Sequence, residues 1–267
     1  MTSNFSPPAG AKSRFKVKLL ADGRAALNLG CGTRMHWSWN NLDSSPYIWL
    51  AHHPTIAAML NKVGVISGER YQRLQKVDPE AVRWHLAKGI PFADNTFDVV
   101  YHAHLLEHLE REAAPAFLQE CLRVLKKKGI IRIVVPDLEI LTNRYHESLN
   151  LLKQSQDETA AARHAQAIDD LFEQMVRGET AGARQQRKLV RVIENLVRGD
   201  AAKTGELHRW MYDAYSLTRL LTAVGFKDIR AQNAFSSQIA GWTSFNLDTN
   251  ADGSVNKPES LYLEGVK

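Results

Sequence analysis

The sequence has few cysteines and no long apolar run. Only Cys31 and Cys121 occur among its 267 residues, and they lie far apart in the chain. Two isolated thiols exclude a disulfide framework and a metal site built from clustered cysteines, and they fit a reducing compartment. The sequence contains no run of about eighteen apolar residues, and its first twenty or so residues lack the apolar stretch of a signal peptide. We therefore expect a cytoplasmic protein without a membrane span.

The composition is that of a folded globular protein. Hydrophobic residues make up 44% of the chain and charged residues 24%, which excludes collagen-like and disordered proteins. The length of 267 residues favours one domain with an insertion. The net charge of +5 comes from two basic segments, residues 1–24 and 184–203, on a body that is close to neutral. This distribution favours a flexible arm and one charged helix face over a groove for nucleic acid.

Short apolar segments alternate with segments of helical periodicity along most of the chain. Strands are expected at residues 25–29, 39–43, 82–86, 97–101, 130–135, 227–231 and 260–266. Helices are expected at residues 54–76, 112–127 and 217–224. This alternation predicts an α/β fold with a mostly parallel, seven-stranded sheet and helices on both faces.

The alternation stops after the fifth expected strand. Apolar residues recur at helical spacing from Ile168 to Val176 and again from Leu189 to Val197. The pattern predicts an insertion in which two amphipathic helices form a hairpin or lid. The predicted organisation is therefore a flexible basic arm (1–24), a core (25–138 and 206–267) and a helical insertion (139–205).

A glycine-rich turn follows the first expected strand. The segment LNLGCGTR places Gly30, Cys31 and Gly32 where a strand leads into a turn. Glycine lets a backbone approach a ligand closely, and a following helix N-terminus offers free N–H donors. Met35 stands where a pyrophosphate-binding loop has its third glycine, which favours a nucleoside cofactor without a pyrophosphate. The alternative is a tight turn that binds no ligand.

Asp43 lies at the end of the second expected strand. One carboxylate in this place can accept hydrogen bonds from both hydroxyls of a ribose. The alternative is a turn-forming or helix-capping role before Ser44, Ser45 and Pro46. The position at the end of a strand favours the ribose.

Five segments occur in the order found in one known enzyme family. They are LNLGCG, GIPFADNTFDVVYHAHLLEHL, RVLKKKGIIRIVVPD, HRWMYDAYSLTRLLTAVGF and SLYLEGVK. Together they resemble the class I S-adenosylmethionine-dependent methyltransferases. The last two resemble a branch of small predicted methyltransferases associated with surface-polysaccharide biosynthesis. The resemblance implies a Rossmann-like fold, S-adenosylmethionine as cofactor, and a small-molecule acceptor such as a nucleotide sugar or glycan.

The resemblance also implies roles for individual residues. Asn28 stands where relatives often have an acid, so it keeps an acceptor but lacks the charge. His85 stands where relatives often have Asp near the adenine, and the backbone amide of Leu86 can still recognise that base. The candidate cofactor-binding residues are Asn28, Gly30, Cys31, Gly32, Asp43, His85, Leu86 and His102.

Histidines cluster after the fourth expected strand. His102, His104 and His108 occur there beside Glu107. His104 and His108 have the i, i+4 spacing of helical metal ligands, but no third ligand follows at a dependable spacing, and we predict no metal site. His102 and His104 are candidate site residues, and the alternative is that these imidazoles cap helices or fill the core.

His208 lies where the insertion returns to the core. Substrates of open α/β sheets bind near such junctions. A hydroxyl acceptor must lose its proton as it attacks the methyl group, and an imidazole suits that task. His208 is therefore the leading candidate for the general base and His104 the second. The alternative is that His208 and Tyr212 hold the insertion against the core, with Trp210 and Met211 simply buried.

The sequence thus predicts an S-adenosylmethionine-dependent methyltransferase that acts on a small polar acceptor, with a sugar hydroxyl in glycan biosynthesis as the favoured choice. An RNA or DNA methyltransferase would use the two basic segments instead. A module that binds the cofactor without catalysis would tolerate Asn28 and His85. Met35 disfavours a nicotinamide-dependent oxidoreductase. The acceptor, the methylated atom and the oligomeric state stay open.

Overall fold

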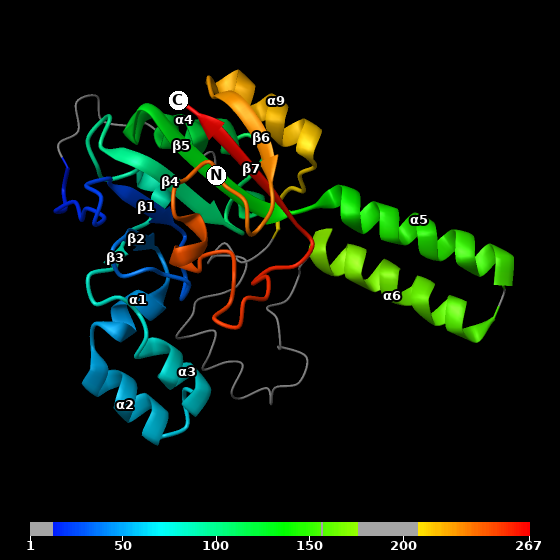
Figure 1. The fold of residues 1–267 in the computed structure, drawn as a ribbon. Coiled ribbons are helices and arrows are strands. Elements are labelled where there is room, and N and C mark those ends of the chain that lie inside the picture. The colour runs from blue at the N-terminus through cyan, green and yellow to red at the C-terminus, as the bar shows by residue number, and fades with distance from the viewer. Residues whose placement is uncertain (1–12, 156, 176–207) are drawn as a thin grey trace.

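A single seven-stranded sheet forms the centre of the protein. The computed structural model describes residues 13–155, 157–175 and 208–267. The strands are β1 (Ala26–Leu29), β2 (Asn40–Asp43), β3 (Val82–Arg83), β4 (Phe97–Ala103), β5 (Leu125–Pro136), β6 (Lys227–Gln232) and β7 (Ser260–Val266). Their order is β3-β2-β1-β4-β5-β7-β6 (Figure 1). Neighbours from β3 to β5 pair in parallel, whereas β7 is antiparallel to β5 and β6. The predicted Rossmann-like, mostly parallel fold is confirmed.

Helices connect the strands, with two differences from the expected boundaries. They are α1 (Pro46–Ala51), α2 (Pro54–Lys62), α3 (Gly68–Leu74), η1 (Leu86–Lys88), η2 (Leu106–His108), α4 (Ala114–Val124), α5 (Leu138–Ser155), α6 (Glu158–Met175), α9 (Ala214–Val224) and η4 (Trp242–Phe245). The expected helix over 54–76 is two helices, because Gly64 takes a left-handed φ of 74° and Ser67 caps α3. The third strand is shorter than expected, because His85 caps η1.

The junction between α4 and β5 also differs from the expectation. The helix expected over 112–127 ends at Val124, and β5 begins at Leu125. Leu125 is opposite Phe97 of β4 and Ile130 is opposite Val99, so the lysine-rich stretch between them forms an irregularity within β5. Lys128 takes a left-handed φ of 66°. Pairing with β4 therefore overrides the helical periodicity of this segment.

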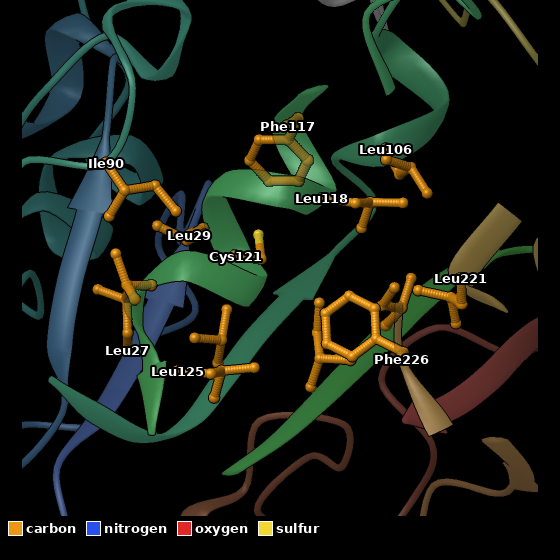
Figure 2. Close-up of a cluster of buried hydrophobic side chains, with 14 of the residues drawn as sticks. Leu27, Leu29, Ile90, Leu106, Phe117, Leu118, Cys121, Leu125, Leu221 and Phe226 are labelled. Carbon is orange, nitrogen blue, oxygen red and sulfur yellow. The ribbon is translucent and has the colours of Figure 1, made fainter. Parts of the chain in front are cut away.

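Two apolar clusters enclose the sheet. On one face, Leu27 of β1, Phe117 of α4 and Leu221 of α9 belong to one cluster, in which α9 packs against α4, β6 and β7 (Figure 2). On the other face, Tyr101 of β4 packs with Trp242 and other residues of the segment 234–247. That segment contains the 3-10 helix η4. Both faces of the central strands are thus covered, which is why these strands are apolar along their length.

Helices α5 and α6 form a hairpin that projects from the body of the protein (Figure 1). They follow β5, where the sequence predicts the helical insertion. The second predicted amphipathic segment, from 189 to 197, lies outside the described residues. No helix in the described part of the chain is both long and apolar enough to cross a membrane.

Residues 13–24 lie against the sheet, although the sequence predicts that they belong to a flexible arm. The ring of Phe15 contacts Trp84 and Phe92 at centroid distances of 6.1 and 6.2 Å. The ammonium of Lys18 lies 2.6 Å from the Asp78 carboxylate. Burial of aromatic surface and this ion pair fix a segment whose composition alone indicated a solvated arm.

Candidate active site

Two loops flank the point at which the strand order reverses. The glycine loop, residues 30–34, follows β1, and residues 104–109 follow its neighbour β4. Ligands of open α/β sheets bind at such a switch point, outside the carboxyl ends of the strands. The two loops are in contact, because a Cβ placed on Gly30 would lie 3.0 Å from Leu105 Cδ1. The candidate site is therefore built from these two loops.

The two glycines of the loop have different surroundings. Gly30 and Gly32 have left-handed φ values of 63° and 52°. A Cβ on Gly32 would meet no protein atom within 4 Å, whereas one on Gly30 would press against Leu105. Gly32 thus leaves its backbone open to a ligand, while Gly30 allows the two loops to pack closely.

Asp43 fixes the glycine loop at the end of β2. Its Oδ2 accepts a hydrogen bond from the Gly32 amide at 2.7 Å, and its Oδ1 accepts one from the Ser45 amide at 2.6 Å. The cap of α1 is Ser45, whose hydroxyl accepts from the Tyr47 amide. Burial raises the pKa of Asp43 above its ordinary value. Each carboxylate oxygen keeps a further lone pair that can accept from a ribose hydroxyl.

Asn28 and Cys31 support the loop from within the protein. The Asn28 amide nitrogen donates to the carbonyl of Arg34 at 3.0 Å and to the side chain of Asn41 at 3.2 Å. Cys31 is buried beside Ile48, and this burial raises the pKa of its thiol well above the ordinary value. Both side chains therefore contact other parts of the protein. Their proposed role in cofactor binding is to hold the glycine loop in place.

His85 and Leu86 follow β3 and lie close to Asp43 in the fold. The amide of Trp84 donates to the carbonyl of Asp43 at 2.8 Å, which joins the ends of β2 and β3. His85 is exposed, and its Nδ1 accepts from the Ala87 amide at 3.2 Å. The structure thus brings the predicted adenine-recognition residues next to the predicted ribose acid.

His102 lies in the core beneath the second loop. Its ring is fully buried and packs against Phe117 at a centroid distance of 5.4 Å. Neither ring nitrogen has a hydrogen-bond partner in the described structure. Burial lowers the pKa of His102 to about 4, so this imidazole is neutral at physiological pH. Among the two predicted residues of this strand end, His104 is the more exposed.

His104 and Glu107 form the centre of the second loop. His104 has a left-handed φ of 50°, and its Nε2 lies 3.0 Å from the Ser260 hydroxyl. Its Nδ1 lies 3.2 Å from Oε1 of Glu107, whose side chain is fully buried. Burial acts to raise the pKa of Glu107, but the adjacent His104 and His108 bring it below the ordinary value. Glu107 is therefore a buried carboxylate among imidazoles.

The chain that returns from the insertion adds His208 to this group. The amides of Arg209 and Trp210 donate to the Glu107 carbonyl at 2.6 and 3.2 Å. As a result, His208 Nε2 lies 3.9 Å from Glu107 Oε1, and the His208 and His108 rings are 4.8 Å apart. The side chain of His208 is only 2% exposed. The two predicted catalytic histidines thus share one carboxylate.

The sequence predicted the histidines as site residues, but it indicated no role for three of their partners. Glu107 was noted only as a neighbour, although the spacing H-x-x-E-H puts it within reach of both imidazoles. Ser260 of β7 contacts His104, and the Gln174 carbonyl of α6 contacts His208. No local pattern could identify these two partners, because they come from distant parts of the chain.

Comparison with known proteins supports the reading of the fold. Residues 27–133 match the protein family described as "Methyltransferase domain". This stretch runs from β1 to β5 and contains the glycine loop, Asp43 and the segment 104–109. No curated protein matches the sequence.

Among solved structures, 248 chains match. A SAM-dependent methyltransferase from Archaeoglobus fulgidus is 14% identical, with 91% of this chain and 86% of that chain covered and a TM-score of 0.37. A possible histamine N-methyltransferase from Thermotoga maritima is 13% identical, with 91% and 82% covered and a TM-score of 0.41. A 1,6-didemethyltoxoflavin-N1-methyltransferase from Burkholderia thailandensis, solved with S-adenosylhomocysteine, is 13% identical, with 91% and 71% covered and a TM-score of 0.39.

These likenesses to solved structures are low in identity and TM-score, so the assignment rests on the family match and on the strand order. The matched stretch contains the two loops that form the candidate site. Residues 27–133 match a methyltransferase domain, and the enzyme class predicted from the sequence, an S-adenosylmethionine-dependent methyltransferase, is confirmed.

Proposed function

We propose that this methyltransferase transfers the methyl group to a hydroxyl of a small polar acceptor. The observation that carries the proposal is the buried carboxylate of Glu107 among His104, His108 and His208, next to the glycine loop. A hydroxyl is a poor nucleophile until its proton leaves, so it needs basic groups beside the reacting methyl. A neutral amine acceptor would not require such a group.

The proposed cofactor site uses the glycine loop and the ends of β2 and β3. The ribose hydroxyls would bind the Asp43 carboxylate, and the adenine would lie near His85 and Leu86. The backbone at Gly32 would approach the cofactor in this proposal, and it is open to a ligand, since a Cβ there would meet no protein atom within 4 Å. Asn28 and Cys31 hold this loop in place.

The proposed acceptor site lies on the other side of the switch point. Transfer is an in-line displacement at the sulfonium, in which the protein orients both substrates and excludes water. His208 or His104 would take the hydroxyl proton, and Glu107 would hold the imidazole in position. Both histidines lie within 4 Å of this carboxylate, at 3.9 and 3.2 Å.

A sugar is the acceptor class that we favour. Trp210, two residues after His208, is 38% exposed, and the guanidinium of Arg111 lies 4.3 Å from its ring centroid. A half-exposed indole offers an apolar face for a sugar ring, and an arginine suits the phosphate of a nucleotide sugar. The resemblance to methyltransferases of surface-polysaccharide biosynthesis points to the same acceptor class.

Mass spectrometry tests the acceptor. The purified chain is incubated with S-adenosylmethionine and a set of nucleotide sugars and glycans, and products are searched for a gain of one methyl group. Replacement of His208 by Ala should lower kcat by about 10²–10⁴-fold while cofactor affinity stays unchanged. Methylation of amines alone, or full activity without His208 and His104, would contradict the proposal of a hydroxyl acceptor.

Calorimetry tests the cofactor site. Replacement of Asp43 by Asn should weaken S-adenosylmethionine binding by about 10–100-fold, as expected for a lost charged hydrogen-bond acceptor. Because burial raises the pKa of Asp43, the affinity of the intact protein should fall as the pH is lowered through that pKa and the carboxylate is protonated. The variant should lose this pH dependence. Asp22→Asn, at an exposed position, is the control that should leave affinity unchanged.

A further inference from the structure

We infer that Glu107, His108 and His208 form a binding site for one divalent metal ion of the zinc type. Each residue offers one ligand atom, and these atoms lie within 4.8 Å of one another. Two imidazoles and one carboxylate are the donor set of catalytic zinc sites, which leave a fourth position for water or substrate. We call these three residues the Glu107 site.

The carboxylate of Glu107 supports the inference because it is buried without hydrogen bonds. The residue is 0% exposed, and neither Oε1 nor Oε2 accepts a hydrogen bond in the described structure. His104 Nδ1 lies 3.2 Å from Oε1 without the geometry of a hydrogen bond. A buried carboxylate needs a compensating positive charge, since leaving it unpaired costs several kcal/mol. A cation bound between the ligand atoms supplies that charge.

The orientation of His208 supports the same conclusion. Its Nδ1 contacts the Gln174 carbonyl, which can only accept a hydrogen bond, so Nδ1 carries a proton. In the neutral imidazole, Nε2 then presents a lone pair toward Glu107 Oε1, 3.9 Å away. At this distance both atoms can coordinate one ion placed between them. Metal-bound histidines commonly donate their other ring N–H to a backbone carbonyl in this way.

His104 completes the surroundings of the carboxylate. Its ring lies between the Ser260 hydroxyl, 3.0 Å from Nε2, and Glu107 Oε1, 3.2 Å from Nδ1. Groups that hold a ligating carboxylate in this manner are typical of the outer shell of metal sites. In this proposal His104 therefore holds the carboxylate in place and is not itself a metal ligand.

The backbone assembles the site from two distant segments. The amides of Arg209 and Trp210 both donate to the carbonyl of Glu107, so the chain at 208–210 is fixed against η2. The sequence lacked a third ligand near His104 and His108. The fold supplies it from His208, a hundred residues along the chain from His108.

The role of the ion rests on the proposed function. A bound divalent ion would coordinate the acceptor oxygen and lower the pKa of its hydroxyl, which reduces the need for a separate general base. Glu107 and His108 lie in the loop that follows β4. This loop contacts the glycine loop through Leu105 and Gly30. His208 would then act as a ligand, and the hydroxyl proton would pass to His104, the second candidate for the base.

Metal binding by the full-length chain tests the inference. The protein is stripped with EDTA, dialysed and titrated with Zn²⁺ by calorimetry, and the Co²⁺-loaded protein is examined by visible absorption for tetrahedral d–d bands. Glu107→Gln and His108→Gln remove one ligand each with little change in volume. His146→Gln, at an exposed position on α5, is the matched control. Circular dichroism and S-adenosylmethionine binding verify the fold of each variant.

We expect one Zn²⁺ per chain in the intact protein and in His146→Gln. Each ligand variant should bind at least about 100-fold more weakly, because loss of an outer-shell partner alone costs up to that factor. Absence of Zn²⁺ binding, or equal affinity in all variants, would overturn the site and return His208 to the role of base. Zn²⁺ binding without S-adenosylmethionine binding would instead contradict the cofactor assignment and leave the metal site standing.

Discussion

Gly30 and Gly253 share a left-handed backbone conformation but differ in the space around the position of a Cβ atom. Gly30 and Gly253 have left-handed φ values of 63° and 81°. A Cβ on Gly253 would meet nothing within 4 Å, whereas one on Gly30 would press against Leu105. Substitutions at these two glycines therefore distinguish the free energy lost to backbone strain from the free energy lost to steric overlap between the two site loops.

Gly30→Ala should destabilise the protein more than Gly253→Ala. Both variants force a side chain into the left-handed region, at about 1–2 kcal/mol each. At Gly30, the contact with Leu105 adds about 1–3 kcal/mol and displaces the glycine loop, which we propose binds the cofactor. Urea denaturation measures the stabilities, and calorimetry should show weaker S-adenosylmethionine binding for Gly30→Ala alone. Equal losses in both variants would show that the contact with Leu105 is unimportant.

At the scale of elements, one buried arginine joins β5, β7 and the segment before β7. Arg132 is fully buried, and its guanidinium lies 2.7 Å from both Asp248 and Glu264. The same guanidinium lies over the ring of Trp242, 4.5 Å from its centroid. The ion pairs of Arg132 with Glu264 on β7 and with Asp248 thus attach the irregular segment that contains Asp248 to the sheet.

Arg132→Met should be strongly destabilising, because it leaves two buried carboxylates without their cation. We expect a loss of about 3–5 kcal/mol in the free energy of unfolding. Arg230→Met on β6, an exposed position, is the control and should change stability by less than about 0.5 kcal/mol. Chemical denaturation gives both values. A small effect at Arg132 would mean that the carboxylates find other partners or take up protons.

At the scale of the whole molecule, stability depends on pH through groups that folding keeps neutral. Burial lowers the pKa of His102 to about 4, whereas the imidazole in the unfolded chain titrates near 6.5. The unfolded chain therefore binds a proton first as the pH falls. The contribution of neutral His102 to the free energy of unfolding is fully present above about pH 6.5, and it is lost as the pH falls from about 6.5 to 4.

His102→Leu should reduce the acid sensitivity of the fold. The shift of the His102 pKa corresponds to about 3 kcal/mol of stability lost over that pH range, and the variant should not show this part of the loss. Near neutral pH the variant should be at least as stable, since neither ring nitrogen has a hydrogen-bond partner. Denaturation curves at several pH values provide the measurement, with exposed His146→Leu as control. Parallel pH profiles for the intact protein and His102→Leu would argue against the shift.

The pattern of the sequence determined much of the core. Apolar runs ended by turn residues predicted the sheet, and the glycine loop and Asp43 predicted the cofactor side, because these features act over a few neighbouring residues. Local pattern failed where pairing partners decide the structure, as at Lys126 and Lys127, which belong to β5 and not to the preceding helix. The arm at 13–24 is a second case, since Phe15 and Lys18 bind residues far along the chain.

Only the tertiary structure decided which residues surround Glu107, where we propose that the acceptor binds. His104, Glu107 and His108 are neighbours in the sequence, but Ser260 and His208 join them through β-pairing and through the amides that bind the Glu107 carbonyl. The spacing of residues along a chain predicts contacts within one helix or strand. The partners of a buried carboxylate can instead come from any segments that meet at the same edge of the sheet. The sequence thus determined the residues of the glycine loop, and the packing of distant segments determined the environment of Glu107.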